Sequence, residues 1–165
     1  MIFVTVGTHE QPFDRLIQCI DNLVASGVIQ EDVFIQTGYS TYEPKHCKHK
    51  SLIPFSEMTQ AVQEARIVIA HGGPASFLLP LQYGKIPVVV PRQAEHREHV
   101  NNHQVTFVRA IEERVGNIIP VYEIERLGEI LQNYDDIVTT IPFQSMSHNE
   151  TFNAGLKKVI DDLFI

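Results

Sequence analysis

Short apolar runs alternate along the chain with segments in which apolar residues recur every three or four positions. The runs are typical of strands buried in a sheet, and the periodic segments are typical of helices packed on it. Strands are expected at residues 2–6, 33–37, 51–55, 66–70 and 86–90, with a weaker one at 116–120. Helices are expected from about Phe13 to Gly27 and at residues 56–65, 74–83, 97–111 and 122–132. This alternation predicts an α/β fold, a Rossmann-like open parallel sheet with helices on both faces.

The pattern divides the chain into one domain, a connector and a last helix. Residues 1–138 are expected to form the domain, and the polar segment 139–149 is expected to be a connector. Residues 150–165 predict an amphipathic helix that packs on the domain or on a partner. Its apolar stripe consists of Phe152, Leu156, Val159, Ile160 and Leu163. In the helix expected at 97–111, the residues on one face are Val100, Gln104, Phe107, Val108 and Ile111.

Composition and charge narrow the class of protein. The 165 residues are 44% hydrophobic, which is enough for a single core. The net charge is −7 and the thirteen basic residues are spread along the chain, so binding to nucleic acid or to an anionic membrane surface is not expected. Only two cysteines occur, no basic and apolar leader is visible, and no apolar run approaches the about 18 residues that span a bilayer. A cytoplasmic protein is expected, associated with a membrane only through a partner.

Two loops that follow expected strands carry the candidate chemistry. One is Gly7–Pro12 and the other is His71–Pro74, and ligands of open parallel sheets bind at the carboxyl ends of strands. Glycines allow a ligand to approach the backbone, and Pro74 suits a first helical turn, so the amides near Gly72 and Gly73 are expected to be free to face a phosphate. The alternative is that the glycines only make a tight turn and that His71 is an interior histidine. No G-x-G-x-x-G or Walker motif is present.

A third polar segment lies between residues 88 and 104. Gln93, Glu98, His99 and Asn102 are expected beside a helix start, where such side chains can hydrogen-bond the hydroxyls of a sugar. An alternative is a metal site, since His96, His99 and His103 could share one helical face; H-E-x-x-H is absent, however, and neither cysteine is placed to complete such a site. A further alternative is that these residues are simply solvated.

Two stretches together resemble a known family. V-G-T-H-E-Q-P-F at residues 6–13, with H-G-G-P at 71–74 and G-K-I-P-V-V-V-P-R-Q at 84–93, is similar to the C-terminal, donor-binding half of family 28 glycosyltransferases, which have the GT-B fold. The similarity runs from Met1 to about residue 132. It is strongest to small stand-alone versions of that half, such as subunits of bacterial capsule and exopolysaccharide synthesis and the cytosolic subunit of the dolichol-pathway GlcNAc transferase.

The resemblance implies an inverting hexosyltransferase subunit that binds a UDP-sugar. It also implies a separate membrane-associated partner subunit that supplies the lipid-linked saccharide acceptor. The start of the helix at Gly72 and Gly73 would take the diphosphate, residues 93–102 the transferred sugar, residues 53–55 the uracil, and the Gly7–Glu10 loop would face the leaving phosphate or the acceptor. The implied substrate-binding residues are Gly7, Thr8, Phe55, His71, Gly72, Gly73, Pro74, Ser76, Gln93, Glu98, His99 and Asn102.

Transfer needs stabilisation of the leaving diphosphate and a base for the acceptor hydroxyl. Backbone dipoles at a helix start can stabilise the diphosphate without a metal, and no Asp-x-Asp motif occurs, so neither a metal nor another cofactor is expected. His9 or Glu10 is the local candidate for the base, unless the partner subunit provides it.

One position departs from the pattern of the family. Many relatives carry a glutamate for the ribose hydroxyls six residues beyond the second glycine, where this chain has Leu79 followed by Pro80. Leucine cannot accept those hydrogen bonds, and Pro80 removes an amide within the helix. This favours an alternative in which the chain is a non-catalytic subunit that stabilises its partner. An enzyme acting on another phosphorylated metabolite is a third hypothesis, and the isolated chain could self-associate through its partner surface.

Overall fold

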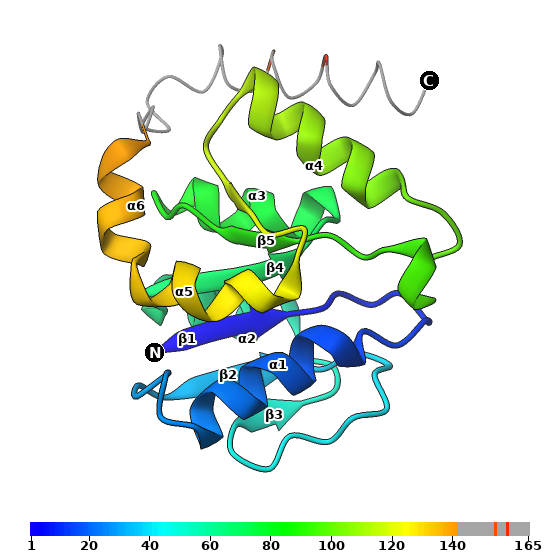
Figure 1. Ribbon diagram of the computed structural model, residues 1–165, viewed down its shortest axis with the longest axis vertical. Helices are drawn as coiled ribbons and strands as arrows, with labels where there is room; N and C mark the ends of the chain where they lie inside the picture. The colour runs from blue at the N-terminus through cyan, green and yellow to red at the C-terminus, as the bar shows by residue number, and fades with distance from the viewer. Residues whose placement is uncertain (142–153, 155–157, 159–165) are drawn as a thin grey trace.

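The computed structural model describes residues 1–141 together with Ala154 and Lys158. Within these residues the strands are β1 Ile2–Thr5, β2 Val33–Gln36, β3 Lys48–Lys50, β4 Ile67–His71, β5 Val88–Val90 and β6 Ile119–Pro120. They form one sheet in the order β3-β2-β1-β4-β5-β6, and every neighbouring pair is parallel (Figure 1). The predicted Rossmann-like open sheet is confirmed, and its strand order reverses direction between β1 and β4.

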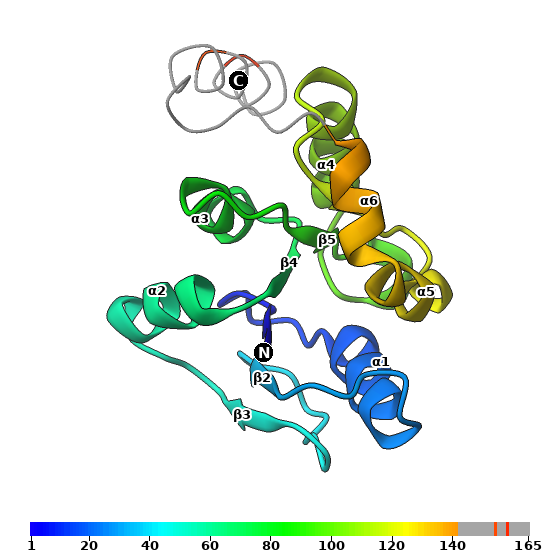
Figure 2. The same ribbon diagram turned by 90° about the vertical axis from the view of Figure 1, so that its left-hand side faces the viewer.

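Helices cover both faces of this sheet, as the sequence predicts. They are α1 Asp14–Ala25, α2 Phe55–Glu64, α3 Pro74–Gln82, α4 His103–Arg114, α5 Leu127–Gln132 and α6 Tyr134–Thr140, with short 3₁₀ turns η1 Ala94–His96 and η2 Ile124–Arg126. Figure 2 shows α2 and α3 on one side of the sheet and α1 and α5 on the other. Alternate residues of β1 face opposite sides, so Ile2 and Val4 pack with α1 whereas Phe3 packs with α2.

The third strand is not where the apolar pattern predicts it. Residues 51–54 form a loop, Phe55 begins α2, and the strand is the polar segment Lys48–Lys50. Pro54 precedes the first turn of α2 and lacks an amide for strand pairing, so it ends the apolar run before that run can form a strand. An edge strand is half solvated, and exposed Lys48 and Lys50 are residues that suit such an edge.

The helix predicted at residues 97–111 begins only at His103. Phe107, Val108 and Ile111 are buried as expected, but Val100 is 77% exposed in the preceding loop. Arg97 has φ 59°, a left-handed conformation that interrupts any helix started at η1. The helix predicted at 122–132 is likewise divided into η2 and α5, and α6 continues into the segment interpreted as a connector.

The C-terminal predictions lie mostly outside the described residues. This applies to the helix expected at 150–165 and to the connector beyond residue 141. Within the part of the chain that is described, none of the helices combines the length and the apolar character needed to cross a bilayer.

Two carboxylates of α1 anchor the long loop between β2 and β3. Asp14 accepts hydrogen bonds from the amides of Thr41 and Tyr42. Asp21 is buried and accepts from the amides of Lys45 and His46 and from the Tyr42 hydroxyl, at 2.8–3.1 Å. Burial raises the pKa of Asp21, but these hydrogen bonds outweigh it and hold the pKa below its ordinary value.

We expect Asp21→Asn to lower the free energy of unfolding at pH 7 by about 2 kcal/mol, because it removes acceptors from a buried network. The folded-state pKa is depressed, so the stabilisation by Asp21 is complete above about pH 3.9, the ordinary aspartate value, and is lost as the pH falls through the lower folded value. Urea unfolding between pH 7 and pH 2 measures both effects. The exposed Asp32→Asn is the control, and equal losses in the two variants would contradict this assignment.

Candidate functional site

A pocket of about 520 Å³ opens at the carboxyl edge of the sheet, between the loops after β1, β3 and β4. We call it the edge pocket; its lining residues are Thr5, Gly7, Thr8, His9, Gln36, Leu52, Ile53, Phe55, Met58, His71, Gly73, Pro74, Ala75, Ser76 and Leu79. A larger groove of about 1010 Å³ runs along α1 beside η1 and η2. That groove lacks both the glycine turn and the start of α3, so the candidate site is the edge pocket.

The imidazole of His71 forms the base of the glycine turn. The Gly73 amide donates to His71 Nδ1 at 3.1 Å, and Gln104 Nε2 lies 3.2 Å from the same nitrogen. Because Nδ1 accepts these bonds, the ring proton resides on Nε2, which lies 2.7 Å from Ser76 Oγ. Burial, followed by the nearby Arg92 charge, lowers the pKa of His71 to about 3, so the ring is neutral at physiological pH.

Glycine is required on both sides of this ring. A Cβ atom at Gly7 would lie 2.3 Å from His71 Nε2, and one at Gly73 would lie 2.3 Å from His71 Cε1. Gly7 also has φ 78°, a conformation that favours glycine. The two backbones therefore enclose the imidazole, and any side chain at Gly7 or Gly73 would collide with this ring.

Neither glycine amide of the turn is free, contrary to the expectation from the sequence. The Gly72 amide donates to Gln104 Oε1 at 3.0 Å and the Gly73 amide donates to His71. Pro74 has no amide hydrogen, and the Ser76 amide donates to the Gly73 carbonyl at 3.1 Å. At the start of α3, the residues that line the edge pocket are Gly73, Pro74, Ala75 and Ser76.

The floor of the edge pocket contains a buried polar pair that sequence reasoning missed. Thr5 Oγ1 donates to Gln36 Oε1 at 2.7 Å, and Gln36 Nε2 donates to the carbonyls of Gly7 and Ser51. These contacts tie the loop after β1 to the segment after β3. The available signal was a polar residue at the end of each of two otherwise apolar strands, Ile2–Thr5 and Val33–Gln36.

One side of the edge pocket is apolar. It is formed by Leu52, Ile53, Phe55, Met58 and Leu79. Phe55 is 74% exposed, whereas Leu79 is half-buried and packs with the α2 core cluster. The edge pocket thus has polar groups at the start of α3 and an apolar side formed by the start of α2, the loop before it and Leu79 of α3.

Several polar side chains of the loop between β5 and α4 form hydrogen bonds within the protein. Gln93 Nε2 donates to the Tyr122 carbonyl at 2.8 Å, and Asn102 Oδ1 accepts from the Ala94 amide at 2.9 Å. Glu98 is buried and forms two 2.9 Å contacts with Arg15 of α1. The four residues expected to contact a sugar, Gln93, Glu98, His99 and Asn102, all lie outside the lining of the edge pocket, and so does Gly72, which was expected at the diphosphate.

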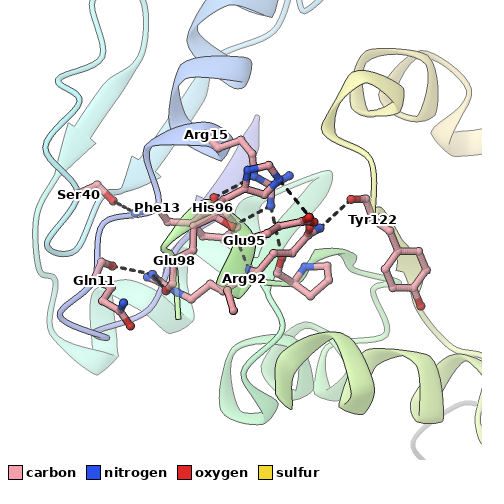
Figure 3. Close-up of polar contacts among 12 residues, drawn as sticks. Gln11, Phe13, Arg15, Ser40, Arg92, Glu95, His96, Glu98 and Tyr122 are labelled. Carbon is pink, nitrogen blue, oxygen red and sulfur yellow. Dashed lines mark hydrogen bonds and ion pairs between the residues drawn. The ribbon is translucent and has the colours of Figure 1, made fainter. Parts of the chain in front are cut away.

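Arg92 joins this loop to the loop after β1 (Figure 3). Its guanidinium is fully buried and donates to the carbonyls of Val6 at 2.7 Å, Gln11 at 2.6 Å and Glu98 at 3.1 Å. It also stacks 5.0 Å above the Phe13 ring. Burial lowers the pKa of Arg92 to about 10, so the group remains charged at pH 7. Because the bonded carbonyls of Val6 and Gln11 flank the Gly7–Glu10 loop, Arg92 fixes both ends of that loop.

His9, which lines the edge pocket, contacts His99 of the loop between β5 and α4. Their rings are stacked with centroids 4.6 Å apart and planes 13° apart, and His9 Nε2 lies 2.8 Å from Gln11 Oε1. His99 does not line the edge pocket itself but contacts it through His9. Glu10, the other candidate base, is exposed and lies outside the pocket lining.

The three histidines of the alternative metal site do not have the helical arrangement on which that alternative depends. Residues 97–102 are not helical, so His96, His99 and His103 do not share a helical face. Over the described part of the chain, no cluster of three or more His, Cys, Asp or Glu side chains could hold a metal ion.

Comparison with known proteins adds a family and a fold. The model of the glycosyltransferase family 28 C-terminal domain matches residues 1–163. The chain is similar to the solved glycotransferase of kitacinnamycin, with 14% identity and a TM-score of 0.51, over 98% of this chain and 38% of that one. It is also similar to the glycosyltransferase SnogD from Streptomyces nogalater, with 17% identity and a TM-score of 0.51, over 98% and 37%. No curated protein matches the chain significantly. The chain thus spans about two fifths of the two solved proteins, with which it shares a fold.

Proposed function

The chain belongs to the glycosyltransferase family 28 C-terminal domain family, and on this premise we propose that its edge pocket binds a UDP-sugar. In this proposal it is the donor-binding subunit of a two-component, inverting hexosyltransferase. The observation that carries the proposal is the hydrogen-bond chain from His71 to Ser76 at the start of α3. The donor is a substrate, and the mechanism uses no metal.

Ser76 is set up to donate a hydrogen bond to a phosphate oxygen. The neutral His71 carries its proton on Nε2 and donates it to Ser76 Oγ, so the hydroxyl proton of Ser76 is available to another acceptor. Ser76 also lies in the first turn of α3, where the positive end of the helix dipole favours an anion. As the bond to the diphosphate breaks, this group stabilises the charge on the leaving oxygen.

The apolar side of the edge pocket suits the nucleoside. Leu52, Ile53 and Phe55 offer a surface on which a uracil ring can pack, next to the polar side that takes the diphosphate. The described lining of the edge pocket includes no Asp, Glu, Lys or Arg side chain, so its polar recognition relies on hydroxyl, amide and imidazole groups.

The second component is proposed to be a membrane-associated subunit that brings a lipid-linked saccharide, as in capsular or exopolysaccharide synthesis. Large apolar side chains are exposed in the loops at the carboxyl edge of the sheet: Tyr39, Leu52, Phe55 and Val100 are each more than half exposed, and Leu52 and Phe55 line the edge pocket. All four lie in loops after strands or at the helix start that follows, on the edge where a cleft-forming partner would sit. In this proposal, the partner forms the acceptor side of the cleft.

We expect Ser76→Ala to weaken UDP binding about 10-fold, because it removes a hydrogen bond to a charged group. Isothermal titration of the full chain with UDP measures the change. Ser26→Ala, at the end of α1 and outside the edge pocket, is the matched control and should leave binding unchanged. Equal affinities of wild type and Ser76→Ala would remove the phosphate assignment.

Sugar transfer tests the rest of the proposal. The chain is co-expressed with an acceptor-side subunit, and transfer from UDP-Glc, UDP-Gal and UDP-GlcNAc to a lipid-linked acceptor is measured. Transfer from one of these donors is expected only when both components are present. If a correctly assembled complex transferred sugar from none of the three donors, the hypothesis that the chain is a hexosyltransferase subunit would be contradicted.

A second candidate function is a non-catalytic subunit that stabilises its partner. Leu79 favours it, because an apolar side chain on the wall of the edge pocket cannot hydrogen-bond ribose hydroxyls. This alternative predicts no saturable UDP binding by the wild-type chain, whereas the donor-binding subunit predicts binding that Ser76→Ala weakens.

A further inference from the structure

Gln11 determines which nitrogen of His9 carries the proton. Gln11 Nε2 donates to the Arg97 carbonyl at 3.5 Å, and Gln11 Oε1 lies 2.8 Å from His9 Nε2. A carbonyl oxygen only accepts, so the amide nitrogen of Gln11 must face Arg97 and its oxygen must face His9. That oxygen also only accepts, so His9 carries its proton on Nε2 and keeps the lone pair on Nδ1.

Arg97 places the carbonyl on which this orientation depends. It is the single non-glycine residue with positive φ among the described residues, and its amide donates to the Ala94 carbonyl at 3.0 Å. The 3₁₀ turn η1 thereby holds the Arg97 backbone in a fixed left-handed conformation. The loop between β5 and α4 thus fixes which end of the Gln11 side-chain amide faces His9.

His99 fixes the plane of the His9 ring. The two imidazoles are nearly parallel and stacked, and the Asn101 amide donates to His99 Nδ1 at 3.4 Å, which anchors the second ring to its own loop. Burial, followed by the charges of His9 and Arg92, lowers the pKa of His99, so its ring is neutral at physiological pH. Because the His99 ring is uncharged, it does not repel a positive charge that forms on the His9 ring during the reaction.

We propose that Gln11 and His99 are positioning residues that make Nδ1 of His9 the proton acceptor of the glycosyl transfer. The step rests on the proposed function. The acceptor hydroxyl gives its proton to His9 Nδ1 while its oxygen bonds to the anomeric carbon of the donor sugar. The bond from that carbon to the phosphate oxygen breaks, and UDP leaves with the electron pair. His9 becomes an imidazolium with both nitrogens protonated, and its Nε2–H remains bonded to Gln11.

Nitrogen NMR of the full chain labelled with ¹⁵N-histidine tests the tautomer without any activity. His9→Gln assigns the signals. In the wild type, the neutral His9 is expected as the Nε2–H form, and Gln11→Leu is expected to give a mixture of both forms. Gln11→Glu, which restores an acceptor oxygen, is expected to recover the Nε2–H form. Gln18→Leu on α1 is the matched control without effect. A wild-type His9 in the Nδ1–H form, or a tautomer unchanged in Gln11→Leu, would overturn the proposal.

Kinetics with the partner subunit test the catalytic consequence. Gln11→Leu and His99→Ala are expected to lower kcat about 10-fold with little change in the donor KM, since the base is displaced while the donor pocket is intact. His99→Phe keeps a stacked ring and is expected to retain most of the rate. His96→Ala, exposed in η1, is the control.

The two failures can be told apart. If UDP does not bind and no sugar is transferred from any donor, the proposed function is wrong. The NMR spectrum still reports whether Gln11 determines the tautomer of His9. If transfer occurs and Gln11→Leu retains full kcat, the positioning role falls and the glycosyltransferase remains.

Discussion

Gly73→Ala is expected to weaken UDP binding about 100-fold and to destabilise the fold by about 3 kcal/mol. Gly73 has φ −76° and ψ 134°, which alanine adopts readily, so the effect is steric and not conformational. The new methyl group would lie 2.3 Å from His71 Cε1. The imidazole cannot move away, because the Gly7 backbone closes the other side of the ring. The ring or the start of α3 must shift, and either shift separates His71 from Ser76.

A double-mutant cycle isolates this collision. Once His71→Ala has removed the ring, adding Gly73→Ala should cost much less stability than it costs in the wild type. Titration with UDP and urea unfolding give the two readouts for all four proteins. Gly128→Ala in α5 is the matched control, since its new methyl group would meet only the ends of side chains, Leu23 Cδ2 at 3.0 Å and Val28 Cγ1 at 3.9 Å. Additive effects of the two substitutions at His71 and Gly73 would show that the enclosure of the ring does not explain the glycine.

Arg92→Met is expected to lower the free energy of unfolding by about 3 kcal/mol. Methionine fills much of the space of the arginine stem but leaves the carbonyls of Val6, Gln11 and Glu98 without their donor inside the protein. The arginine Nε has no hydrogen-bond partner among the described atoms, so the wild-type site is itself not fully satisfied, which limits the loss. Arg92→Lys should recover only part of it, because a single ammonium cannot follow the geometry of the guanidinium.

The consequence for the site distinguishes Arg92 from an ordinary core residue. When the two ends of the Gly7–Glu10 loop are released, the His9 and His99 rings should lose their stacking, which the ¹⁵N-histidine spectrum reports. Urea unfolding gives the stability. Arg109→Met, at an exposed arginine that lies 5.1 Å above the Tyr122 ring, is the control and should cost less than about 0.5 kcal/mol. An Arg92→Met variant as stable as the wild type would show that the bridge between the two loops is dispensable.

Where the sequence misled, local and tertiary preferences disagree. The run at residues 51–55 is apolar, but Pro54 lacks an amide for strand pairing and Phe55 already begins α2. The strand that pairs with β2 at the exposed edge is the polar segment Lys48–Lys50. Residues 97–102 have helical spacing, yet bonds from Gln93, Glu98 and Asn102 within the loop fold it into a turn. The same bonds draw these polar side chains away from the edge pocket, a placement that spacing along the chain does not contain.

The apolar pattern by itself determined the parallel sheet, its two helical layers and the edge that holds the candidate site. Buried strands and amphipathic helices are encoded by nearest neighbours in sequence, and the carboxyl ends of parallel strands must meet on one side. Only the tertiary structure decided three features of the site. They are the steric role of Gly7 and Gly73 beside His71, the hydrogen bonds that the glycine amides donate, and the residues that contact His9. Those contacts join residues dozens of positions apart, such as His9 with His99 and Gly72 with Gln104, and their geometry depends on packing that no short stretch of chain specifies.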